Sequence, residues 1–135
     1  MNRLTPLFLS FAALLLLAIG SAILLFPHAF YASDGIVLGN EPSLLSEIRA
    51  PGGLLAVSGL CVLIGAFRQS LRSSALMLTV LVYGSFGLSR LVSLSLDGSP
   101  SSSLLVATTI ELVMAAIGLG ILSRLPSVQS HSSTN

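Results

Sequence analysis

Charged side chains are scarce in this sequence, and lysine is missing altogether. Only 8% of the 135 residues are charged and 53% are hydrophobic, whereas about a quarter of the residues in a soluble domain are charged. With a net charge of +1 the chain has no basic patch of the kind that binds nucleic acid, so we expect no nucleic-acid partner. We expect one domain whose apolar surface is covered by a lipid bilayer rather than by a large protein core.

The residues that usually build redox, metal and cofactor sites are almost absent. Cys61 is the single cysteine, which excludes an internal disulfide and a CxxC site. Its leucine and valine neighbours predict a small buried hydrophobe rather than a reactive thiol. His28 and His131 have no second histidine or cysteine at metal-ligand spacing, and phosphate-loop, GxSxG and HExxH motifs are lacking. We therefore expect no metal and no cofactor.

Four long hydrophobic runs dominate what is present. We predict helices at about 5–26, 47–67, 74–96 and 104–123, each long enough to cross roughly 30 Å of hydrocarbon. The first run continues past its small residues to Phe26, which favours a retained helix over a cleaved signal peptide. The sequence thus predicts an all-α integral membrane four-helix bundle over residues 1–125, followed by a short disordered polar tail at 126–135.

The arginines predict how the chain is oriented. With four spans, Arg3, the Arg68–Arg72 loop and Arg124 fall on one side, and the acidic residues of the other two loops fall on the opposite side. The positive-inside rule then puts both termini in the cytoplasm. We expect a multi-pass protein of the bacterial plasma membrane.

Two charged residues lie inside the predicted spans. Arg90 and Glu111 are each about six or seven residues from the external end of their helix, roughly 10 Å below the boundary at 1.5 Å per residue. Since an unpaired charge at mid-helix costs on the order of 2.5–3.5 kcal/mol, we predict a direct Arg90–Glu111 pair. Such a pair is either an interhelical staple or part of a functional site.

The segment "SEIRAPGG" adds two charges at the entry of the second span. Glu47 and Arg49 are two residues apart and cannot face each other on a helix. One interpretation is a network in which Glu47 reaches Arg90 and Arg49 reaches Glu111; the other is interfacial snorkelling. Gly52 and Gly53 are predicted close-approach glycines, where a helix or ligand can come near the backbone.

Two further patterns concern packing. Pro51 is expected near the start of its helix, where a missing N–H costs little. Three small-xxx-small pairs indicate close helix packing: Ala18/Ala22, Ser85/Ser89 and Ala116/Gly120.

The order of these motifs resembles a known family. "SEIRAPGG", a basic loop, "GLSRLVSLSLDGSP" and "IEL" are similar to the small bacterial four-helix membrane proteins of domain of unknown function 4345. The family pattern places Glu-x-Arg before Gly-Gly, Arg-Leu-x-Ser before Asp-Gly-x-Pro, and Glu-Leu in the last helix. The family often has an aromatic residue before the two glycines, where this sequence has Pro51. The resemblance implies the four-helix fold and no particular activity.

Three classes of function follow. We expect a non-enzymatic membrane protein whose Glu47, Arg49, Arg90 and Glu111 bind a small polar ligand or lipid headgroup or stabilise an assembly. The assembly would be a homo-oligomer or a complex with a membrane-protein partner. The first alternative is a small oligomeric transporter or channel with Glu111 in the pathway. The second is a membrane enzyme, for which no nucleophile–base pair is visible.

Overall fold

A computed structural model describes residues 3–125. Its elements are α1 (Leu4–Leu25), α2 (Pro27–Ala32), α3 (Pro42–Phe67), η1 (Gln69–Leu71), α4 (Arg72–Asp97) and α5 (Ser102–Leu122). The four long helices are apolar and long enough to cross a membrane. This confirms the all-α class and the four apolar helices of membrane-span length.

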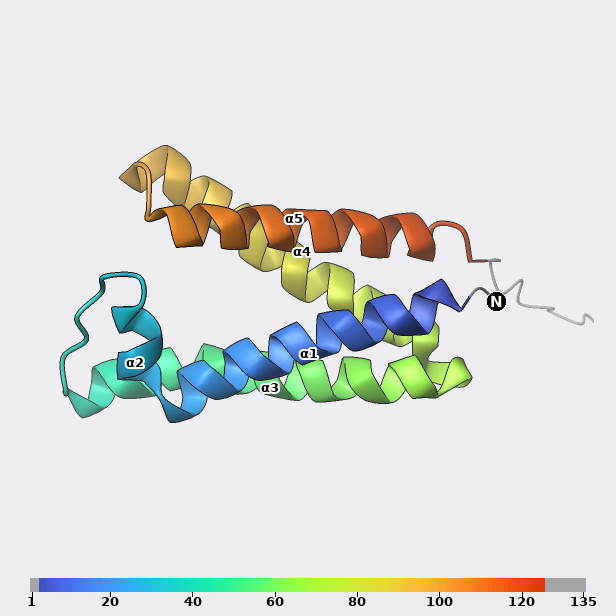
Figure 1. Cartoon of the computed structure of the whole chain (residues 1–135), viewed down its shortest axis with the longest axis horizontal. Helices are drawn as coiled ribbons and strands as arrows, with labels where there is room; N and C mark the ends of the chain where they lie inside the picture. Colours follow the sequence, from blue (N-terminus) through green and yellow to red (C-terminus); the bar gives the residue numbers. More distant parts are fainter. Residues whose placement is uncertain (1–2, 126–135) are drawn as a thin grey trace, which may run out of the picture.

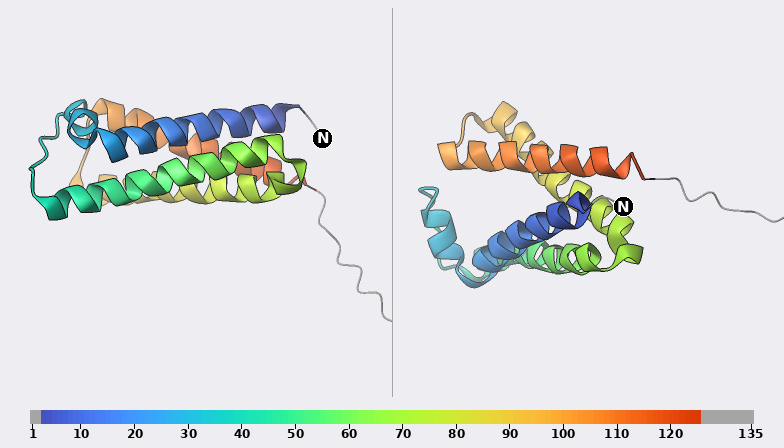
Figure 2. Two further views of the ribbon diagram at one scale, coloured as in Figure 1. Left: turned by 90° about the horizontal axis from the view of Figure 1, so that it is seen from below. Right: turned by 45° about the vertical axis from the view of Figure 1, so that its right-hand side comes forward.

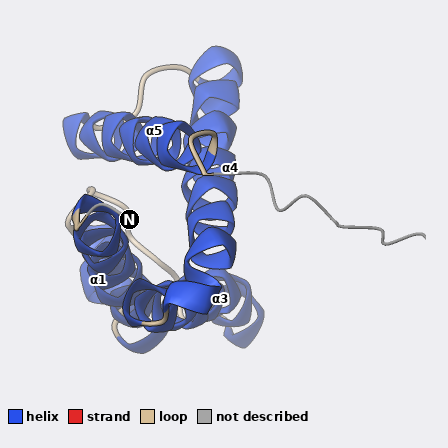
Figure 3. Ribbon diagram, turned by 90° about the vertical axis from the view of Figure 1, so that its right-hand side faces the viewer, coloured by secondary structure: helices blue, strands red, loops and turns tan. Residues whose placement is uncertain are grey.

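The long helices are arranged as two pairs (Figure 1). Helix α1 packs most extensively on α3, and α5 packs on α4. Among the described residues α3 also contacts α4, but α5 has no comparable backbone contact with α1 or α3. Viewed end-on, α4 connects the α1–α3 pair to α5 (Figure 3). Helix α5 therefore packs mainly on α4, and it meets α1 only through side chains such as Phe8, which lies near Gly118.

The two pairs lie together at one end of the molecule and apart at the other, where α2 and its loop are found (Figures 1 and 2). Burial follows this arrangement. Helix α4 buries Ala75, Leu76, Thr79, Tyr83 and Gly87, whereas every residue from 91 to 97 is exposed. The buried core is therefore concentrated where the first half of α4 meets the α1–α3 pair.

The helix ends have local causes. Pro27 and Pro42 occupy the first positions of α2 and α3, where the missing N–H has no intrahelical role. Helix α4 ends at Asp97 and is followed by Gly98, whose φ of 95° favours glycine. The Ser101 hydroxyl caps α5 by accepting a hydrogen bond from the Leu104 N–H at 3.4 Å. These residues set where each span begins and ends.

The closest helix packing uses glycines other than those in the predicted small-residue pairs. A Cβ on Gly20 would lie 2.4 Å from the Ala56 nitrogen, and a Cβ on Gly59 would lie 2.8 Å from the Leu17 nitrogen. Ala18, Ser85, Ser89, Ala116 and Gly120 are instead exposed. The small-xxx-small spacing identified small residues, but it did not show which face of each helix packs on a neighbouring helix.

Two further expectations need correction. Helix α3 begins at Pro42, five residues before the expected start, so Pro51 lies inside the helix and the Glu47 carbonyl lacks its i+4 N–H partner. Cys61 is exposed on α3 rather than buried, because the buried face of this helix runs through Leu55, Val62 and Ala66. In a membrane an exposed apolar position faces lipid, so hydrophobic neighbours do not indicate burial in protein.

Candidate functional site

Helices α4 and α5 bring Arg90 and Glu111 into direct contact. The Arg90 Nε donates to both carboxylate oxygens of Glu111, at 2.9 Å to Oε2 and 3.2 Å to Oε1. The Arg90 side chain is 33% exposed and the Glu111 side chain 15%. The pair predicted from matching depth is present, and it is only partly shielded from its surroundings.

Gly87 allows this pair to form. It lies about one turn before Arg90, and a Cβ at this position would be 3.0 Å from Leu112 Cγ and 3.4 Å from Glu111 Cβ. Because glycine has no side chain, α5 can lie close against α4 at this level. The Glu111 side chain therefore starts near enough to α4 to reach Arg90.

Among the described residues, Arg90 donates hydrogen bonds through its Nε alone. Within residues 3–125 no acceptor takes a hydrogen bond from either terminal Nη group, and neither Nη is a buried unsatisfied atom. A guanidinium presents five N–H donors in a planar fork that suits carboxylate and phosphate. The site therefore offers oriented donors to an anionic group.

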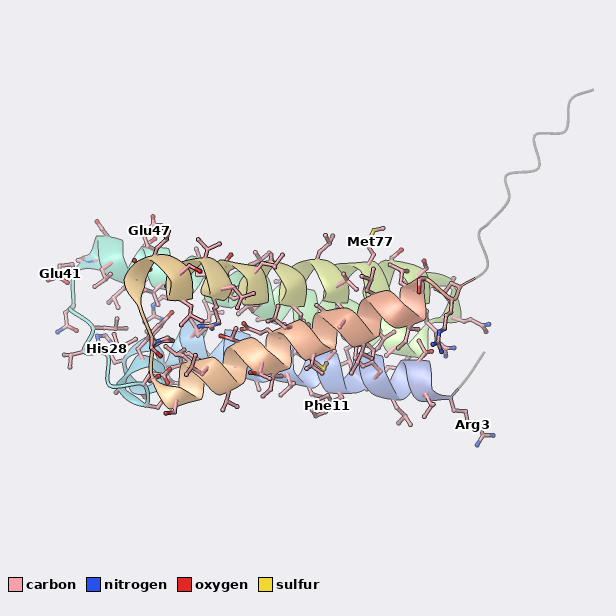
Figure 4. The ribbon with its side chains drawn as sticks, turned by 90° about the horizontal axis from the view of Figure 1, so that it is seen from above. Arg3, Phe11, His28, Glu41, Glu47 and Met77 are labelled. Atoms are coloured by element: carbon pink, nitrogen blue, oxygen red, sulfur yellow. The ribbon has the colours of Figure 1, made fainter. Side chains whose placement is uncertain are left out.

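The predicted four-residue network is not formed. Glu47 is exposed and points away from the bundle (Figure 4). Arg49 is half-buried and its Nη1 donates to the backbone carbonyl of Leu24 instead. The physical reason is that α4 and α5 lie apart from α3 at this end, so charges on α3 cannot reach the pair.

The two glycines after Pro51 differ. Gly52 is buried, and a Cβ there would lie 2.8 Å from Ile23 Cγ2 and 3.0 Å from the Leu24 nitrogen. Gly53 has only Leu24 Cδ1 within reach, at 4.0 Å. Gly52 is thus a close-approach glycine between α3 and α1, whereas Gly53 is not.

Two sets of side-chain hydrogen bonds between distant elements were not predicted from the sequence. The buried Tyr83 hydroxyl donates to the Ala12 carbonyl at 2.8 Å and joins α4 to α1. Asp34, in the loop after α2, accepts hydrogen bonds from Ser101 (3.5 Å) and from Ser103. A tyrosine inside a span signals a hidden hydrogen bond, but its partner is a backbone carbonyl and leaves no sequence mark.

No group of three His, Cys, Asp or Glu side chains that could hold a metal ion occurs within residues 3–125. The four apolar spans and the partly buried ion pair define a small multi-pass membrane protein. The chain belongs to the family described as domain of unknown function DUF4345, whose profile matches residues 4–122. The resemblance inferred from the motifs is confirmed. No curated protein and no solved structure matches the chain.

Proposed function

We propose that this chain is a non-enzymatic, multi-pass protein of the bacterial plasma membrane that binds an anionic group at Arg90. The carrying observation is that Glu111 engages Arg90 through Nε alone, while the terminal nitrogens have no acceptor within residues 3–125. Glu111 fixes the position of the guanidinium and offsets part of the cost of placing a charge in a membrane span. An oxyanion can then bind to the remaining N–H groups.

The arrangement of charges supports an outward-facing site. Arg3 lies at one end of the molecule, and His28, Glu41 and Glu47 lie at the other (Figure 4). Arg90 belongs to the half of α4 nearer the second end. With the arginine-rich end in the cytoplasm, the ion pair lies in the outer half of the bilayer.

The bound anion has two possible sources, a free small molecule or the headgroup of a lipid, and the same variants test both. Purified full-length protein is titrated with inorganic phosphate in a thermal-shift assay. A second portion is equilibrated in nanodiscs that contain phosphatidylglycerol, and retained lipid is counted by native mass spectrometry. We expect Arg90→Gln to weaken the binding of phosphate, or of the lipid, about tenfold, which is the size of one charge-assisted contact. The weaker binding appears as a smaller thermal shift at a given phosphate concentration, or as less lipid retained per chain.

Arg68→Gln is the matched control, since Arg68 is exposed in the loop between α3 and η1. Glu111→Gln removes the competing negative charge, and we expect anion binding at Arg90 to be kept or strengthened. If Arg90→Gln and Arg68→Gln behave alike in both assays, the pair is a structural staple and the proposal is wrong.

A further inference from the structure

A second arginine, Arg49, lines a groove at the end of the α1–α3 pair where α1 ends and α3 begins. The groove has a volume of about 590 Å³ and lies between the end of α1 and the first turns of α3. Its walls include Leu24, Leu45, Ser46, Arg49 and Gly53. Neither Arg90 nor Glu111 lines it, so it is separate from the site described above.

Its depth in the membrane follows from helix length. Helix α3 has 26 residues and ends at Phe67, and about 20 helical residues cross the hydrocarbon core. Counting back from Phe67, the core ends close to Arg49. Leu24 is the penultimate residue of α1. The groove therefore begins at the level of the lipid headgroups and extends into the acyl-chain region.

Arg49 is positioned by a backbone carbonyl, and no carboxylate among the described residues neutralises its charge. Its Nη1 donates to the Leu24 carbonyl, one of the last four carbonyls of α1 that lack an intrahelical partner. Within residues 3–125 no carboxylate forms an ion pair with Arg49. Ser46, about one turn earlier, is exposed, and no hydrogen bond to its hydroxyl is formed by the described residues. The groove thus has a fixed cation and a free hydroxyl at headgroup level.

Gly53 is explained by this groove better than by helix packing. A Cβ there would meet only Leu24 Cδ1, at 4.0 Å, so alanine would fit against α1. Glycine instead leaves the groove wall beside Leu24 without a side chain. A lipid chain lying along the helix needs this kind of open apolar surface.

We propose that this groove binds one anionic phospholipid. The phosphate accepts hydrogen bonds from Arg49 and Ser46, and an acyl chain lies against Leu24 and Gly53. An anionic lipid is favoured over a zwitterionic one because the charge of Arg49 has no carboxylate partner in the described chain. A phospholipid is favoured over a free anion because the lining residues on the membrane side of Arg49, namely Leu24, Ala50 and Gly53, are apolar.

The test uses full-length protein in nanodiscs of phosphatidylcholine with a minor fraction of phosphatidylglycerol. After release into detergent, lipids retained per chain are counted by native mass spectrometry. We expect wild type to retain one phosphatidylglycerol that Arg49→Gln loses, with about a tenfold drop in affinity. A lipid bound at Arg90 would be counted as a second phosphatidylglycerol, so the Arg49→Gln change is also made in the Arg90→Gln background. We expect Arg90→Gln to retain the groove lipid and the double variant to lose it, whether or not the proposed function at Arg90 holds.

Gly53→Leu is the second variant, because it keeps the arginine and fills the groove. A Cβ at this position meets only the flexible end of Leu24 and no backbone atom, so the α1–α3 pair is expected to stay folded. We expect Gly53→Leu to lose the same lipid, and Gly120→Leu, at an open position on α5, to keep it. The proposal is overturned if Gly53→Leu retains the lipid like wild type, or if phosphatidylcholine is retained equally well.

Discussion

At the scale of single residues, three arginines of this chain illustrate three ways of placing a cation in or near a membrane. Arg90 is paired with a carboxylate at 2.9 Å. Arg49 is bound to a backbone carbonyl at a helix end. Arg68 is exposed in a loop. Only the first arrangement requires a matched acid on another helix, which is why Glu111 can be identified from its depth alone.

The Arg90–Glu111 pair is expected to be energetically coupled. Arg90→Ala and Glu111→Ala should each destabilise the protein, because each leaves the partner charge uncompensated. The double variant should be milder than the sum by about 1 kcal/mol, a modest coupling because Arg90 is one-third exposed. Reversible unfolding in mixed micelles, followed by circular dichroism, measures this, with Arg68→Ala as control. Additive effects would falsify the coupling.

At the scale of helices, the α1–α3 pair depends on close backbone approach. Gly20 and Gly59 lie on facing surfaces, each with backbone atoms of the partner helix within 3 Å of a would-be Cβ. Glycines at such an interface let the two helix backbones approach closely, so that the surrounding side chains pack without voids. The α4–α5 pair differs, because the groups nearest Gly87 are side-chain atoms of Leu112 and Glu111.

Gly20→Ala should therefore separate α1 from α3. The new methyl would lie 2.4 Å from the Ala56 nitrogen and 2.7 Å from the Gly52 carbonyl oxygen, and neither atom can move without the helix. We expect a loss of about 1–3 kcal/mol of unfolding free energy, as for overpacked cores. Gly120→Ala is the matched control, since nothing lies within 4 Å of that position, and should change stability by less than about 0.5 kcal/mol. Equal unfolding midpoints for the two variants would contradict this packing.

At the scale of the whole molecule, charge and shape divide the chain into two ends. The end with the arginine loop is where the two helix pairs converge, and the end with Asp34, Glu41 and Asp97 is where they lie apart. There the Asp34 carboxylate joins the loop after α2 to the start of α5 by accepting hydrogen bonds from Ser101, the residue before the helix, and from Ser103 in its first turn. Within the described residues, these two hydrogen bonds are the only side-chain hydrogen bonds between the 33–41 loop and the α4–α5 half of the chain.

The proposed orientation makes a direct prediction. Alkaline phosphatase fused after Asn135 should be inactive, and a fluorescent protein at the same place should fluoresce, because the arginines hold this end in the cytoplasm. Phosphatase inserted after Gly39, in the loop between α2 and α3, should be active. The reverse pattern of reporter activity would overturn the orientation and move both proposed anion sites to the inner half of the bilayer.

The membrane-length helices and the ion pair could be predicted because they depend on properties of short stretches of sequence. The length of an apolar run decides whether it can span, and counting from the loop at Asp97 places Arg90 and Glu111 at equal depth. The family could likewise be recognised from short motifs in order. The extent of α3 could not, because a turn at Pro42–Pro51 and a helix containing Pro51 are both compatible with the residues there.

The sequence by itself thus determined the all-α class, the four membrane-length helices and the Arg90–Glu111 pair, since hydropathy and the cost of a lone charge act within one or two helices. Only the tertiary structure decided which faces meet. In that structure Glu47 and Arg49 lie away from the ion pair, and Cys61 is exposed on the surface of α3. The close helix contacts are made at Gly20, Gly52 and Gly59. Lipid and protein interior are equally apolar, so hydropathy cannot distinguish a face that packs on a helix from one that faces the bilayer.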